Sequence, residues 1–96
     1  MPRTLPITTD APPHAGTLTE LGALVRSARA RARLRIDDAA QLAGVSADLL
    51  SRLERGKPVT SDKLLSVLSS LGLTMLLVDS VQAQQIIRST AREKPE

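Results

Sequence analysis

Two short amphipathic segments joined by a Gly-Val-Ser turn at residues 44–46 constrain the fold of this chain more than any other feature. Over residues 36–43 the apolar face is mostly alanine, which lets another helix approach closely. The glycine of the turn permits a tight corner, and its serine is suited to cap a following helix over residues 47–55, which ends at Gly56. The segment therefore predicts two helices that meet at a sharp angle.

Further helices are predicted on both sides of this pair. Thr17 opens a T-x-x-E capping box, and apolar residues then recur every three or four positions, which predicts a helix over residues 18–32. Another helix is expected to begin after Thr60 or Ser61 and to end before Gly72. The expected fold class is therefore mainly α.

The composition limits the chain to one small core. Its 96 residues contain no cysteine, so disulfides and thiolate metal sites are excluded, and we expect neither a cofactor nor a metal. Aromatic residues are also absent, and sixteen leucines fill their usual place. Since so short a chain buries little surface on its own, we expect it to form an oligomer.

The charge pattern favours duplex nucleic acid as the partner. The net charge of +3 is only mildly basic, but five arginines lie within ten residues, namely Arg26, Arg29, Arg31, Arg33 and Arg35. Single-stranded nucleic acids are held largely by bases stacking on aromatic rings, which this chain lacks. Duplex DNA requires no such stacking.

The two ends of the chain differ from the helical region. Residues 1–16 hold four of the six prolines and show no helical periodicity, which indicates a flexible tail. From Leu73 to Val78 the sequence is apolar apart from Thr74, which predicts a short strand. A lone strand needs a partner, so we expect it to pair with the same segment of a second subunit. The expected dimer interface consists of Leu73, Met75, Leu76, Leu77 and Val78.

The stretch LGALVRSARARARLRIDDAAQLAGVSADLLSRLERGKPVTSDKLLSVLSSLGL resembles the helix-turn-helix domains of the Cro/CI-repressor (Xre) family, most specifically in LAGVS and LSRLERGK. The resemblance implies a lambda-repressor-like domain of four to five helices. The next residues, LGLTMLLVD, are similar to HipB-like antitoxins, in which this segment pairs as a strand between subunits. That subfamily implies a homodimer on a palindromic operator, often with a kinase-type toxin encoded beside it. The expected organisation is a tail over 1–16, the helix-turn-helix domain over 17–72, a dimerisation strand over 73–79 and a flexible or partner-binding tail over 80–96.

The resemblance also assigns roles to individual residues of the helix after the turn. Arg52 is the expected base reader, because a guanidinium can bond both major-groove acceptors of guanine, although a solvated arginine is the plainer interpretation. Asp48 either accepts from cytosine N4 or complements the helix dipole. The family's recognition positions fall on Ser46, Ala47, Asp48, Ser51 and Arg52.

Other family positions predict backbone contacts and an internal ion pair. Arg55 and Lys57 match family positions near DNA phosphates, and Lys63 is a further candidate for such a contact. The alternative is that these charged side chains are only solvated. Arg29 and Glu54 match a pair that ties the first helix to the recognition helix.

The chain departs from the family at the start of the second helix. The family usually has Thr or Ser followed by Gln there, whereas this chain has Arg35 and Ile36, followed by Asp37 and Asp38. Isoleucine cannot donate to a phosphate, and the two carboxylates would repel DNA. Backbone contact on that side is therefore left to the N-terminus of the helix itself, with Arg33 or Arg35 supplying the charge.

Three functions follow from the sequence. The first is a dimeric, sequence-specific transcriptional repressor. The alternative is an antitoxin that neutralises a toxin and regulates its own operon, and the third is a protein that kept the fold but lost DNA affinity. An enzyme is not expected, because the single histidine, His14, lies in the proline-rich tail. No apolar run approaches the roughly 20 residues that cross a bilayer, and we expect a cytoplasmic protein.

Overall fold

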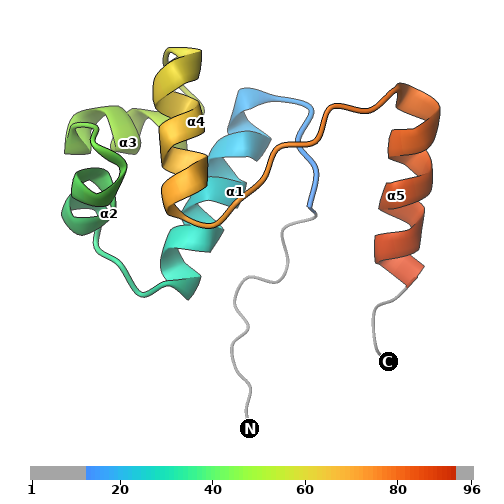
Figure 1. Cartoon of the computed structure of the whole chain (residues 1–96), viewed down its shortest axis with the longest axis horizontal. Helices are drawn as coiled ribbons and strands as arrows, with labels where there is room; N and C mark the ends of the chain where they lie inside the picture. The colour runs from blue at the N-terminus through green and yellow to red at the C-terminus, as the bar shows by residue number, and fades with distance from the viewer. Residues whose placement is uncertain (1–12, 93–96) are drawn as a thin grey trace, which may run out of the picture.

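The computed structural model describes residues 13–92, which form five α-helices (Figure 1). The expected tail over 1–16 therefore lies mostly outside the described residues. The helices are α1 (Leu18–Arg31), α2 (Ile36–Ala43), α3 (Ala47–Glu54), α4 (Ser61–Ser70) and α5 (Ser80–Arg92). The first four agree with the sequence-based boundaries to within one residue at each predicted end.

The predicted caps explain why α1 and α3 begin, and why α2 ends, where they do. The hydroxyl of Thr17 accepts a hydrogen bond from the Glu20 amide at 3.1 Å. The Glu20 carboxylate reaches back to the Gly16 amide at 2.6 Å, one residue earlier than in a standard capping box. Ser46 accepts from the Leu49 amide at 3.0 Å, and Gly44 after α2 adopts φ 74°, which favours glycine.

A small aliphatic core holds α1 to α4 together. Helix α3 packs against α1 and α2, and α2 also packs against α4. The alanine face of α2 lies in the middle, where Ala39 and Ala40 are both buried and leave room for close helix contact. The buried apolar residues are Val25, Ala28, Ala39, Ala40, Leu50, Leu53, Val67 and Leu68.

The strand predicted over residues 73–79 is not formed within the described range of 13–92, so that part of the prediction is wrong for the single chain. The segment has no regular secondary structure, because a strand needs a neighbouring edge and these residues have none to pair with. Only its first residue, Leu73, is anchored, by an amide hydrogen bond of 2.8 Å to the Leu68 carbonyl and by packing against the core.

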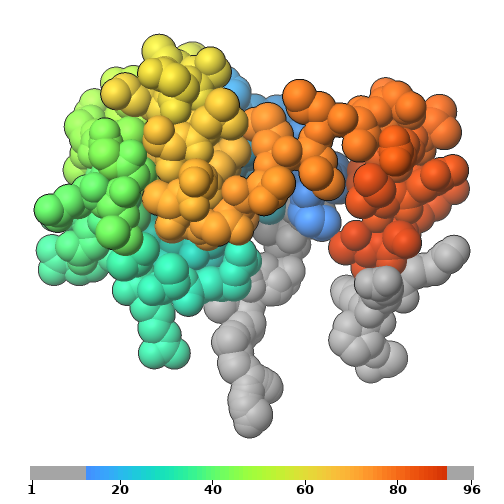
Figure 2. Space-filling view, in the orientation of Figure 1, coloured from blue at the N-terminus to red at the C-terminus, as the bar shows by residue number. Residues whose placement is uncertain are grey.

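Helix α5 follows this segment and was not predicted from the sequence. The tail over 80–96 was expected to be flexible or partner-binding, and the structure has a helix up to Arg92, while residues 93–96 lie outside the described part. Asp79 begins it by accepting from the Gln82 amide at 2.8 Å. Figure 2 shows α5 standing to one side of the four-helix body, to which residues 73–79 connect it.

Candidate nucleic-acid interface

Helix α3 has one face in the core and the other in solvent. Leu50 and Leu53 are completely buried and fix how the helix lies on α1 and α2. The polar residues predicted to contact DNA lie on the remaining surface: Ser46 and Asp48 are exposed, and Ser51 and Arg52 are partly exposed. Ala47 differs, because it is half-buried and packs against the core.

Each arginine at the end of α3 is held by a residue one turn earlier. Arg52 donates from Nη1 to the Asp48 carboxylate at 3.3 Å. Arg55 donates from Nη1 to the Ser51 hydroxyl at 2.9 Å. These pairs extend both guanidinium groups along the solvent face of the helix and limit the orientations that they sample.

The backbone folds back sharply just after α3. Gly56 adopts φ 81°, and a Cβ there would come within 2.9 Å of Thr19 Cα, so this position needs glycine for two reasons. The Lys57 amide then donates to the Arg52 carbonyl at 2.9 Å. Exposed Arg55 and Lys57 thus flank a tight turn at the end of α3.

The start of α2 has a structural explanation for its unusual sequence. Ile36 is half-buried and packs against the core, so the position that is usually Gln serves hydrophobic packing here. Arg35 is exposed, and its side chain forms no hydrogen bond that caps α2. Its Nη2 lies 3.7 Å from Asp37 Oδ2, and its Nε lies 3.9 Å from Asp38 Oδ2. Its charge is therefore partly balanced by the neighbouring carboxylates, and exposed pairs of this kind are weak.

Arg29 and Glu54 lie together between α1 and α3. Arg29 donates from Nε to Glu54 Oε2 at 2.6 Å and from Nη2 to Oε1 at 2.8 Å. Its third bond, from Nη1 to the Leu34 carbonyl at 3.0 Å, also fixes the connection to α2. The hydrogen bond with Glu54 raises the pKa of Arg29 above its ordinary value, so the guanidinium stays charged.

Two positions that matter for this geometry were missed by the sequence reasoning. A Cβ on Gly22 of α1 would overlap the Leu53 carbonyl oxygen and lie 2.8 Å from that of Glu54, so glycine here lets α1 touch the backbone of α3. Arg33 has φ 58° and ends α1 in a left-handed conformation, where glycine is usual. The signal for Gly22 was a lone glycine inside a helical pattern.

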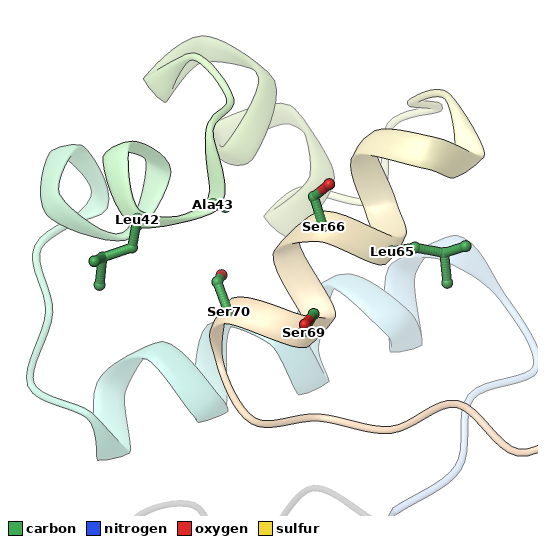
Figure 3. Close-up of a pocket in the computed structure, with 6 residues that line it drawn as sticks. All are labelled: Leu42, Ala43, Leu65, Ser66, Ser69 and Ser70. Atoms are coloured by element: carbon green, nitrogen blue, oxygen red, sulfur yellow. The ribbon is translucent and has the colours of Figure 1, made fainter.

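A shallow hollow lies between α2 and α4. Figure 3 shows Ser66 and Ser70 facing α2, with Leu42 directed outward and Leu65 pointing away from α2. The hollow has no titratable side chain among its lining residues Leu42, Ala43, Leu65, Ser66, Ser69 and Ser70. Within residues 13–92, no acidic or histidine cluster could hold a metal ion, and none of the helices is both long and apolar enough to cross a membrane.

A capped helix that follows a tight glycine turn, lies across a second helix and shows arginines to solvent defines a helix-turn-helix DNA-binding domain. A family model described as "Helix-turn-helix domain" matches residues 20–79, and the chain belongs to this family. The crystal structure of the clp gene regulator ClgR from C. glutamicum is similar at 31% sequence identity and a TM-score of 0.56, covering 86% of this chain and 100% of that chain. No curated protein matches the chain.

These comparisons establish the class of protein. The resemblance to Xre-family regulators is confirmed, and the chain is a helix-turn-helix DNA-binding transcriptional regulator like ClgR. The expectation that it is not an enzyme is confirmed as well, because the family consists of regulators rather than catalysts.

Proposed function

We propose that the chain is a dimeric repressor that reads a palindromic operator through α3. The observation that carries this proposal is the solvent face of α3, on which Arg52 and Arg55 are both held in place by neighbours on the same helix. An arginine fixed in this way loses less freedom when it bonds a base or a phosphate. Arg52, in the last turn of α3, is the residue that we assign to guanine.

The other polar residues divide into two groups. Arg55 and Lys57 at the end of α3, together with Arg35 at the start of α2, contact phosphates and set the position of the domain on the duplex. Ser46, Ala47 and Ser51 lie close to the base edges, with Ala47 limited to apolar contact because its side chain is a methyl group. The weakest of these assignments is Arg35, since Asp37 and Asp38 share its charge.

The dimer is proposed to form through residues 73–79 and α5. Leu77 is 89% exposed and Leu76 is 68% exposed, which is unusual for two adjacent leucines in a small protein. Leu73 packs against the core of its own chain, so this assignment rests on Met75, Leu76, Leu77 and Val78. A helix of 13 residues that stands apart from the body is marginal in water, and contact with a second chain would stabilise it.

The same exposed leucines support the antitoxin alternative, because a toxin protein could cover them instead of a second copy. Light scattering at micromolar concentration tests whether a second copy covers them. The repressor proposal expects a dimer of the isolated chain, which becomes a monomer when Leu76→Asp and Leu77→Asp are combined. Leu42→Asp, which changes another exposed leucine on α2, is the matched control and should leave the dimer intact. A wild-type monomer would favour a different protein partner.

The function itself is tested by selecting bound sequences from random duplexes and measuring affinity by fluorescence anisotropy. The proposal expects two inverted half-sites about one helical turn apart, and affinity that falls steeply as salt rises. Transcription from a promoter that holds this site should increase when the protein is removed. Equal affinity for every duplex, or none, would contradict the proposal.

A further inference from the structure

The pair of Asp48 and Arg52 has a geometry that the stability of the fold does not require. Asp48 is 78% exposed and Arg52 is 42% exposed, so the ion pair lies at the surface of α3, outside the core. Exposed ion pairs at this spacing contribute little to the stability of a fold. The acid nevertheless lies one turn before the base, which is the favourable order on a helix.

An aspartate at this place also opposes DNA binding in general. Its charge repels phosphates, and in the major groove a carboxylate is accepted only opposite a donor, the amino group of cytosine or adenine. A surface whose sole task is to attract DNA would therefore not carry it. The solvent-facing residues near it are the partly exposed Ser51 and Arg52 of α3 and the exposed Arg55 just after the helix, so Asp48 is the acidic group among them.

We infer that Asp48 is a positioning residue that makes Arg52 selective, an inference that rests on the proposed function. Asp48 holds the guanidinium through Nη1, which leaves the other N–H donors of Arg52 available to a pair of acceptors on a base. Guanine offers two such acceptors, O6 and N7, on one edge. Other bases do not, so at those sites the held guanidinium gains no bidentate bond, while the charge of Asp48 still repels the phosphates.

Arg55 offers an internal comparison. Its partner one turn earlier is the neutral hydroxyl of Ser51, at 2.9 Å. A hydroxyl holds the guanidinium without adding negative charge, which suits an arginine that contacts phosphates at any sequence. The two arginines of α3 are thus held by partners of different charge, and only Arg52 has the partner that penalises a wrong base.

The test compares the affinity of Asp48→Ala and wild type for the selected operator and for a random duplex of equal length. We expect random-duplex affinity to rise, and the ratio of operator to random affinity to fall by about five- to tenfold, within the discrimination that one bidentate contact supplies. Asp38→Ala on α2 removes the same charge away from Arg52 and should raise both affinities equally, leaving the ratio unchanged. Circular dichroism establishes that each variant is folded.

A double-variant cycle shows whether Asp48 acts through Arg52. In the Arg52→Ala background, Asp48→Ala should no longer change the ratio. The inference is overturned if the Asp48→Ala ratio equals that of wild type, if both affinities fall together, or if the effect persists without Arg52. A wild-type protein with no operator preference would instead contradict the proposed function, so the two failures are distinguishable.

Discussion

Arg29 of α1 and Glu54 of α3 are joined side by side through two hydrogen bonds, with Nε 2.6 Å from Oε2 and Nη2 2.8 Å from Oε1. The side chain of Glu54 is only 7% exposed and that of Arg29 is 19% exposed. Because Glu54 is the last residue of α3, this pair fixes the end of the helix that carries Arg52 and Arg55.

Breaking this pair should destabilise the protein more than replacing it. We expect Glu54→Ala to lower the free energy of unfolding by roughly 2 to 4 kcal/mol, because Arg29 is left without its partner. The loss is reduced by solvent screening, since the Arg29 side chain is partly exposed. The double variant Arg29→Met with Glu54→Leu should lose less free energy of unfolding than Arg29→Met alone or Glu54→Leu alone, since no unpaired charge remains. Urea denaturation measures all of these, and a double variant less stable than both singles would contradict the explanation.

Gly22 should resist substitution although it lies inside a helix. Helix propensity alone makes Gly22→Ala favourable by about 0.5 to 1 kcal/mol. The added Cβ would overlap the Leu53 carbonyl, so we expect a net loss of roughly 1 to 3 kcal/mol instead. Ala23→Gly, at the exposed neighbouring position, is the control and should lose only the propensity difference. Thermal unfolding that shows Gly22→Ala to be stabilising would mean that α1 and α3 are not in such close contact.

Arg33 should be one of the few places where a glycine stabilises a helix end. Its φ of 58° is unfavourable for a residue with a side chain. We therefore expect Arg33→Gly to raise the free energy of unfolding by about 0.5 to 1 kcal/mol, net of the extra chain entropy that glycine loses. Arg33→Ala keeps the left-handed strain while removing the charge, and equal stability of the two variants would attribute the effect to charge.

Arg52 and Lys57 should affect DNA binding in different ways. Arg52→Ala is expected to relax the preference at one base pair in each half-site, at a cost of roughly 1 to 3 kcal/mol for the preferred sequence. Lys57→Ala should weaken binding to all sequences alike. It should also make the slope of log affinity against log salt concentration shallower by about one unit. Anisotropy titrations over single-base operator variants separate these outcomes, and uniform weakening by Arg52→Ala would assign that residue to a phosphate.

How far the sequence predicted the fold depends on the kind of signal. Helices α1 to α4 could be predicted because their apolar period agrees with a serine or threonine before α1, α3 and α4 and with a glycine after α2, α3 and α4. The run from Leu73 to Val78 was misread as a strand, because β-branched and apolar composition indicates burial without showing what supplies it. Helix α5 has few apolar residues, and its real signal, Asp79 followed three residues later by Gln82, was overlooked.

The candidate site could be predicted from the sequence only in part, for a related reason. The recognition helix and the pairing of Arg29 with Glu54 follow from motif positions, and the structure contains that pair. The contact between Asp48 and Arg52 depends on rotamers at the surface, which composition and spacing do not determine. The burial of Ile36 likewise depends on how α2 lies on the core, so its sequence looked only like a missing phosphate contact.

The central claim, that α3 enters the major groove of duplex DNA, is tested most directly by protection of guanine N7 from dimethyl sulfate on the selected operator. This atom lies in the major groove and is one of the two acceptors assigned to Arg52. The account predicts protected guanines in two half-sites, centred about 10 base pairs apart, and loss of that protection in Arg52→Ala. Operator binding that leaves every guanine N7 reactive would contradict it.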